Sequence, residues 1–258
     1  MRVMTYNILA AHWTEYMDVQ LRYEPFKAVL DTYDPDIAGL QEVCTKWIQL
    51  LNNGISDKYG IIHPRTPDNL HPNFSVIIYK KDRFEVEAAG YGMYDGTSHG
   101  ALANPWCYSW AVLKDKESGA RFAFTSTHFV WVSIDNWAMR DRFAHQLSAF
   151  LADLEKKYSV PVVAMGDYNA HVKEPAYSTM KSSLLSAREV AIERINMEYK
   201  TTNRVGQPPA LNESGTDAVD HCFISPEGLI PHRYELIIEP RSYAYSDHVP
   251  QRLTFELC

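Results

Sequence analysis

Short apolar runs with strand character recur along this chain, and several of them end directly on a polar side chain. Residues 3–6, 36–40 and 160–165 are three such runs. Packed strands carry the side chains at their ends to one rim of a sheet, where loops form binding and catalytic sites. We therefore expect one site assembled from residues far apart in the sequence. The polar side chains that follow strands in this way are Asn7, Glu42, His128, Asp167 and Asn169.

Amphipathic segments lie between the strands. Apolar residues recur every three to four positions over 23–33, which predicts a helix that ends before Pro35. A second helix is expected to begin near Asn136 and to bury a stripe within 143–154. This alternation favours an α/β fold, specifically a four-layer α/β sandwich of two mixed β-sheets flanked by helices. Further strands are expected at residues 74–79, 84–88, 108–113, 121–127, 218–224, 235–238 and 252–257.

The length and composition permit a single large core. Of the 258 residues, 46% are hydrophobic, and no linker-like stretch, composition shift or internal repeat divides the chain. We therefore expect one domain over residues 1–258. The four cysteines are scattered without a CxxC pair, which indicates small core side chains and not a disulfide framework or a thiolate metal site.

The charge balance is acidic, because 25 Lys and Arg stand against 32 Asp and Glu for a net charge of −7. A protein that binds duplex DNA through its overall field usually carries the opposite sign, although a mildly negative surface is also ordinary for a soluble protein. No apolar stretch approaches the roughly 20 residues that span a bilayer. The first residues run straight into a strand and leave no room for a secretory signal. We expect a cytoplasmic monomer without stable membrane insertion, with a secreted protein as the alternative if a leader precedes the sequence as given.

The candidate site residues combine carboxylates with amides and imidazoles. Hard oxygen ligands beside amides suit Mg²⁺, Mn²⁺ or Ca²⁺, whereas a zinc site would need clustered His or Cys such as HExxH, which is absent. A metal held by carboxylates beside an Asp–His pair is suited to hydrolysis at phosphorus. The full set is Asn7, Glu42, His128, Asp167, Asn169, Asp220, Asp247 and His248.

At these residues the chain closely resembles the endonuclease/exonuclease/phosphatase superfamily, and in particular its bacterial-type members with the DNase I-like fold. Each motif is weak alone, but together they follow the family's order across residues 2–257. The resemblance implies the same four-layer sandwich as the strand and helix pattern. The motifs are Thr5-Tyr6-Asn7, Leu40-Gln41-Glu42, Ser126-Thr127-His128, Gly166-Asp167-Tyr168-Asn169, Val219-Asp220-His221 and Ser246-Asp247-His248.

The resemblance also implies a role for each residue. Glu42 would bind Mg²⁺ or Mn²⁺, helped by Asn7 and by Asp247. Asp167 would orient or deprotonate the attacking water, and Asn169 would hold the phosphate. His248, oriented by Asp220, would bond the scissile phosphate or take part in proton transfer. His128 would donate to a phosphoryl oxygen.

Four further side chains are candidates for substrate contacts. The loop after His128 is unusually aromatic, so Trp131 is interpreted either as local packing or as part of an apolar rim for a base, a sugar or a lipid-like group. Arg140 and Arg142 match an arginine-containing helix start in family members, and either is equally compatible with a solvated helix position. Asn73 stands where relatives often place a polar residue in the cleft. The arginine that many relatives carry just before residues 108–110 is absent here.

Three classes of function are compatible with these residues. The favoured one is a hydrolase of phosphorylated small molecules, including sugar, inositol or lipid head-group phosphates, as phosphodiesters or phosphomonoesters. The second is an endonuclease or exonuclease on DNA or RNA, which would need a basic stripe that the sequence does not show. The third is a non-catalytic binding module of the same fold, but a decayed site would have lost at least one of the eight side chains.

Overall fold

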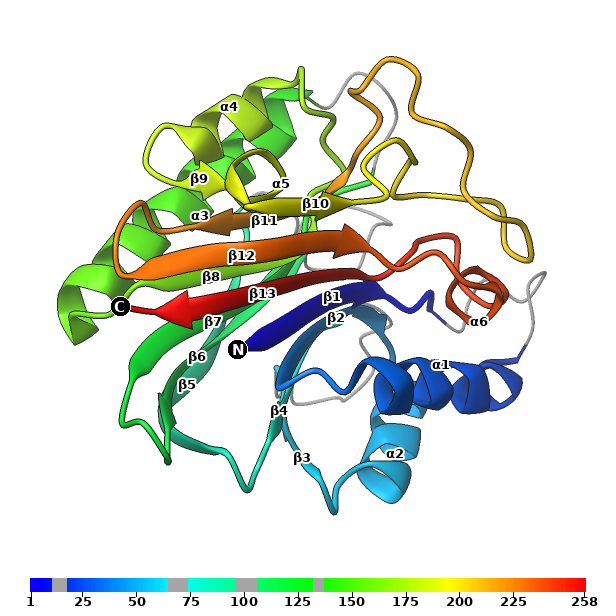
Figure 1. The fold of residues 1–258 in the computed structure, drawn as a ribbon, viewed down its shortest axis with the longest axis horizontal. Helices are drawn as coiled ribbons and strands as arrows, with labels where there is room; N and C mark the ends of the chain where they lie inside the picture. The colour runs from blue at the N-terminus through cyan, green and yellow to red at the C-terminus, as the bar shows by residue number, and fades with distance from the viewer. Residues whose placement is uncertain (11–17, 65–73, 96–105, 132–136) are drawn as a thin grey trace.

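Two mixed sheets packed face to face form the centre of the molecule in the computed structural model, which describes residues 1–10, 18–64, 74–95, 106–131 and 137–258 (Figure 1). The first sheet has seven strands in the order β10 (Glu193–Ile195), β12 (Leu229–Leu236), β13 (Gln251–Leu257), β1 (Arg2–Asn7), β2 (Ile37–Val43), β4 (Phe74–Lys80) and β3 (Tyr59–Ile62). The second has six, in the order β5 (Phe84–Met93), β6 (Cys107–Asp115), β7 (Arg121–His128), β8 (Val162–Asp167), β11 (Asp220–Ile224) and β9 (Leu185–Ser186).

Helices cover the outer faces of both sheets. Helices α1 (Val19–Tyr33) and α2 (Thr45–Gly54) pack on the first sheet, and Figure 1 shows them on the opposite side of the molecule from α3 (Trp137–Tyr158) and α4 (Pro175–Lys181), which cover the second sheet. Short helices α5 (Ala187–Val190) and α6 (Pro240–Tyr243) lie in connections. The four-layer α/β sandwich expected from the sequence is therefore confirmed.

Alternation along β1 shows why the sheets pack in this way. Val3 points between the two sheets and joins a core with Phe124 and Phe255, whereas Met4 points outward and joins the layer that contains Trp47. Successive side chains of a strand face opposite sides, so a strand that is apolar at both positions is buried on both faces. The same reasoning explains β8, where every residue is buried.

Several element boundaries differ from the sequence-based expectation. The strand expected at residues 235–238 is β12, which begins earlier, at Leu229. Its first half carries Pro231 and polar neighbours, and the register shifts between Pro231 and Arg233, so the alternation that marks a strand is interrupted there. Residue 136, where the second long helix was expected to begin, lies outside the described residues. The first helix ends where expected, with Asp34 in the left-handed conformation (φ 43°) just before Pro35.

The two sheets approach each other closely where β2 faces β7. Gly39 of β2 faces β7, and a Cβ atom added there would lie 2.9 Å from the Cβ of Ser126, so only glycine fits. Two residues along, Gln41 spans the gap and donates through Nε2 to Ser126 Oγ at 3.0 Å. Its Oε1 accepts from Thr5 Oγ1 at 3.2 Å. Gln41 thus ties β1, β2 and β7 together next to the strand ends.

The four cysteines are free thiols, three of them buried, which agrees with their interpretation as small core side chains. Among the helices in the described parts of the chain, none is both long and apolar enough to cross a membrane.

Candidate active site

Strand pairing brings the predicted side chains to one edge of the sandwich. Strands β1 and β2 are parallel, with Asn7 beside Gln41, and β7 and β8 are parallel, with His128 beside Asp167. Strand β11 is antiparallel to β8, which places its first residue, Asp220, opposite Asp167. The carboxyl ends of four strands and the start of a fifth therefore share this edge.

Asp167 lies at the centre of the site and is 1% exposed. Its Oδ2 accepts a hydrogen bond from Asn7 Nδ2 at 3.0 Å, across the gap between the two sheets. The same oxygen lies 3.3 Å from His128 Nε2 and 3.6 Å from His248 Nε2. One carboxylate oxygen therefore faces an amide and two imidazoles at once.

His248 is held by Asp220. Its Nδ1–H faces both carboxylate oxygens of Asp220, at 3.1 and 2.9 Å, which leaves Nε2 directed toward Asp167. Ser246 fixes the backbone of this loop, because its Oγ accepts from the amide of His248 and donates to the carbonyl of Asn7 at 2.6 Å. The arrangement is a buried Asp–His pair with its second ring nitrogen presented to the centre of the site.

Asn169 turns the chain immediately after β8. It adopts a left-handed conformation (φ 47°), which asparagine tolerates better than most residues. Its amide N–H donates to Asp167 Oδ1 at 2.9 Å, and its Nδ2 donates to the carbonyl of Phe129 at 3.0 Å. The same Nδ2 lies 3.2 Å from His128 Nε2. Asn169 thereby fixes the orientation of both Asp167 and His128.

Opposite charges in this group shift the pKa values of Asp167 and His248 so that both side chains are ionised. Burial by itself would raise the pKa of Asp167, but the nearby His248 and His128 charges outweigh burial and hold that pKa well below its ordinary value. Burial would lower the pKa of His248, but the Asp220 and Asp167 carboxylates raise it well above its ordinary value. The resting site therefore pairs an ionised Asp167 with an imidazolium at His248.

Glu42 and Asn7 lie beside Asp167, and the carboxylate of Asp247 is close enough to Glu42 to interact with it electrostatically. Glu42 adopts φ 60° at an irregularity in the pairing of β2 with β4, and this turns its carboxylate toward Asn7, which donates to Oε1 at 3.1 Å. Oδ1 of Asp247 is buried without a hydrogen-bond partner among the described residues. Burial raises the pKa of Asp247, and the Glu42 carboxylate also acts to raise it. A hard cation bound here would reduce the repulsion between the two carboxylates and would give the unpaired buried oxygen of Asp247 a partner.

Asp167, Asp220 and His248 also place possible ligand atoms within 4.8 Å of one another. In that group, however, His248 Nδ1 and the Asp220 carboxylate already bond each other, and His248 Nε2 faces an ionised Asp167. Mutual pairing satisfies these groups without a metal. Glu42, Asp247 and the remaining lone pair of Asn7 Oδ1 are therefore the better candidates for holding the cation.

The candidate substrate contacts lie in different surroundings. Trp131 follows the buried end of β7 and is 66% exposed, and Arg142 is exposed on α3. Arg140 is buried on the first turn of α3, where Nε and Nη2 both bond Glu174 Oε2 at 2.9 and 2.7 Å. Asn73 lies outside the described residues. The substrate roles of these four side chains stay predictions.

Some supporting residues carried no signal in the sequence. Thr201 is fully buried, and its Oγ1 accepts from the amides of Val219 and Asp220 at 3.1 and 3.4 Å. It lies in an irregular segment, where the next residue, Thr202, forms an isolated antiparallel β-bridge with His248. Trp106 packs edge-on against His128 with the ring centroids 4.7 Å apart. Neither residue belongs to a strand-end motif, so only the folded chain reveals its contact.

His221, beside Asp220 on β11, faces away from the site as the alternation of a strand predicts. It is buried among aromatic rings, and Nε2 donates to the carbonyl of Ala170 at 2.8 Å. Nδ1 has no hydrogen-bond partner among the described residues. Burial lowers the pKa of His221 to about 4, so this imidazole is neutral in the folded protein.

We expect His221 to make the protein acid-sensitive. The unfolded chain takes up a proton at His221 near pH 6.5, whereas the folded chain does so only near pH 4, so stability falls as pH drops through that window. The difference corresponds to about 3 kcal/mol. His221→Gln keeps a donor for the carbonyl of Ala170 but has no group that titrates in this window. In urea unfolding at pH 7, 5.5 and 4.5, its free energy of unfolding should therefore fall less steeply with pH than that of the wild type. Parallel stability profiles for the two proteins would contradict the expectation.

The sequence matches the model of the endonuclease/exonuclease/phosphatase family over residues 4–248. The fold is a four-layer α/β sandwich, and its site at the strand ends is built from carboxylate, amide and imidazole side chains. The chain belongs to the endonuclease/exonuclease/phosphatase family. No curated protein matches the sequence.

Solved structures share the fold. A mannosyl-6-phosphatase from Bacteroides thetaiotaomicron superimposes with a TM-score of 0.83 at 20% identity, and the match covers 100% of both chains. The human nocturnin catalytic domain with bound sulfate gives 0.77 at 21% identity, covering 100% of this chain and 94% of that one. D. rerio TDP2 complexed with a single-strand DNA product gives 0.73 at 15% identity, covering 99% and 98%. Family members are hydrolases that act on phosphoesters, and these likenesses establish that the chain has their architecture.

Proposed function

We propose that the protein is a divalent-metal-dependent phosphoester hydrolase. The observation that carries the proposal is the position of Asp167, whose Oδ2 faces His128, His248 and Asn7 within 3.6 Å. Beside it, Glu42 and Asp247 supply the oxygen atoms for a cation. These parts together can activate water and stabilise charge on a phosphoryl group, which are the two requirements of phosphoester hydrolysis.

Each side chain has a role that follows from its contacts. The cation, Mg²⁺ or Mn²⁺, would be held by Glu42, Asp247 and Asn7 and would neutralise charge on a phosphoryl oxygen. Ionised Asp167 accepts a hydrogen bond from the attacking water and orients it toward phosphorus. The imidazolium of His248 donates from Nε2 to the phosphoryl or leaving oxygen, with Asp220 holding its ring. His128 adds a second donor, and Asn169 keeps it in place.

For the substrate, we propose a phosphorylated small molecule, sugar or lipid head group. The net charge of −7 disfavours long nucleic acid, because phosphate backbones are bound through Lys and Arg. The exposed Trp131 near the end of β7 offers a surface on which a sugar or another apolar face can pack. A relative of the same fold is a mannosyl-6-phosphatase, which acts on a sugar phosphate. Another was solved with a DNA product, so a nuclease is the alternative to be tested.

Chelation followed by metal addition tests the reaction class. Treatment with EDTA should abolish turnover of bis-p-nitrophenyl phosphate, and Mg²⁺ or Mn²⁺ should restore it. Glu42→Gln should show little recovery at the same metal concentration, because it removes one of the two carboxylates proposed to hold the cation. Glu193→Gln, an exposed carboxylate change on β10, is the matched control and should recover fully. Turnover that survives chelation would contradict the proposal.

A substrate panel then separates the substrate classes. The restored enzyme should hydrolyse sugar phosphates, inositol phosphates or lipid head-group phosphodiesters faster than plasmid DNA or RNA at physiological salt. Efficient cleavage of plasmid DNA under those conditions would replace the small-molecule proposal with the nuclease alternative.

A further inference from the structure

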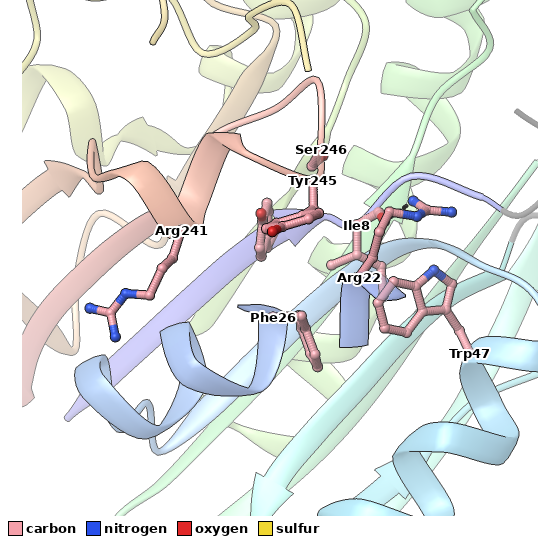
Figure 2. A pocket seen from close by; sticks show the side chains of 8 residues that line it. Ile8, Arg22, Phe26, Trp47, Arg241, Tyr245 and Ser246 are labelled. Atoms are coloured by element: carbon pink, nitrogen blue, oxygen red, sulfur yellow. Dashed lines mark hydrogen bonds between the residues drawn. The ribbon is translucent and has the colours of Figure 1, made fainter. Parts of the chain in front are cut away.

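Arg22 is a fully buried arginine that no part of the reaction described above uses. It lies on α1, is 1% exposed, and its guanidinium carbon lies 5.7 Å from the centroid of the Trp47 ring on α2. Figure 2 shows the Arg22 side chain beside Ile8, with Trp47 below it. Burying a guanidinium is costly unless its donors are bonded, so its contacts require an explanation.

Among the described residues, the guanidinium bonds three consecutive carbonyl groups in the turn after β1. Nη1 donates to the carbonyls of Ile8 and Leu9 at 3.1 and 2.7 Å, and Nη2 donates to that of Ala10 at 3.1 Å. Trp47 Nε1 adds a further hydrogen bond to the Leu9 carbonyl at 3.0 Å. The carbonyl side of this turn is therefore bound by two side chains from the outer helices.

The amide side of the same turn contacts the candidate cation ligands. The N–H of Leu9 donates to Asn7 Oδ1 at 3.1 Å, and the N–H of Ala10 donates to Glu42 Oε2 at 2.9 Å. Leu9 adopts φ 59°, a left-handed conformation that is unfavourable for leucine and persists only when its surroundings impose it. The turn is thus a short rigid link with Arg22 and Trp47 on one side and Asn7 and Glu42 on the other.

We propose that Arg22 is a positioning residue for the cation site: by holding the 8–10 turn through its carbonyls, it sets the amides that orient Asn7 and Glu42. The inference rests on the proposed function, since it takes these two residues as ligands. Arginine suits this role because its planar fork reaches several acceptors at fixed angles, whereas lysine carries a compact point charge whose donors rotate about one nitrogen. Partners that orient metal ligands typically affect metal affinity by about 10–100-fold when they are mutated.

Charge alone makes the opposite prediction from positioning. A buried positive charge near Glu42 and Asp247 repels a cation, so removing it would tighten metal binding if only the Coulomb interaction mattered. Loss of the turn's geometry would weaken metal binding. The direction of the change therefore distinguishes the two effects, and a variant that keeps the charge separates them further.

The test is direct Mn²⁺ binding, followed by the EPR signal of free Mn²⁺ at 25 °C in the absence of substrate. Arg22→Lys and Arg22→Met should both raise the Kd for Mn²⁺ by about 10-fold or more. Trp47→Phe, which removes only the Nε1 donor to Leu9, should raise it by a smaller factor and provides a milder variant if Arg22 changes prevent folding. Leu30→Ala, a buried change elsewhere on α1, is the control and should lower the thermal midpoint while leaving the Kd unchanged.

The outcomes are separable. If the wild-type protein binds no Mn²⁺, the proposed function loses its cation. If the wild type binds but the Arg22 and Trp47 variants bind equally well while folded, Arg22 has only a structural role and the inference is overturned. Tighter binding by Arg22→Met, with Arg22→Lys unchanged, would overturn it in favour of a purely electrostatic effect.

Discussion

Asp167→Asn is expected to lower kcat for phosphodiester hydrolysis by about 10³-fold at saturating Mg²⁺, within the range that positioned acid–base groups contribute. The amide keeps the shape of the side chain but removes the negative charge that faces both imidazoles. It also replaces an oxygen that orients water with a group that can present a donor. The measurement is initial rates on bis-p-nitrophenyl phosphate over a full range of substrate and Mg²⁺ concentrations.

The control for this variant is a second buried carboxylate. Asp115 lies at the other end of the second sheet, where it pairs with Arg83 at 2.8 Å. Asp115→Asn is expected to reduce stability in thermal unfolding without changing kcat by more than a few fold. Equal turnover by Asp167→Asn and wild type would remove Asp167 from the reaction. Equal losses in both variants would mean that the first loss reflects folding.

The strand-end pattern predicted the centre of the site because it depends only on backbone geometry. His128 and Asp167 end adjacent parallel strands, so their proximity follows from register once both strands are recognised. Asp220 begins an antiparallel strand, and its motif, not the periodicity, identified it. The four-layer architecture followed from the alternation of apolar strand-like runs with amphipathic segments.

Contacts made by irregular segments could not be predicted from the sequence. The sequence makes Arg140 a candidate substrate contact, but it does not indicate that its guanidinium bonds Glu174, which lies 34 residues away just before α4. No sequence pattern indicates the contacts of Arg22, because its three acceptors are backbone carbonyl groups and every residue has one. Thr201 is similar, because a threonine in a loop has no periodicity that indicates what its hydroxyl contacts. Side-chain-to-backbone bonds across long separations depend on the whole fold.

Asp220 and His248 are expected to act as one unit, and a double-mutant cycle measures this. His248→Gln replaces the imidazolium that faces Asp167 with a neutral amide that cannot transfer a proton, and it should lower kcat by about 10³-fold. Asp220→Asn keeps the size of the side chain but removes the negative charge that stabilises the imidazolium of His248, and its amide N–H placed against Nδ1 disfavours the doubly protonated ring that donates from Nε2. A comparable change in a buried Asp–His pair of other hydrolases costs about 10⁴-fold in kcat.

The double variant should be no slower than the slower single variant by more than a few fold. Once His248 is absent, Asp220 has no ring to orient, so its own substitution removes nothing further from the reaction. Multiplied losses would mean that the two side chains contribute to separate steps, which is incompatible with both oxygens of Asp220 lying within 3.1 Å of His248 Nδ1. Non-additive losses in kcat would also show that the pair acts in the reaction itself, because a pair that served only stability would shift the free energy of unfolding while leaving kcat of the folded enzyme unchanged.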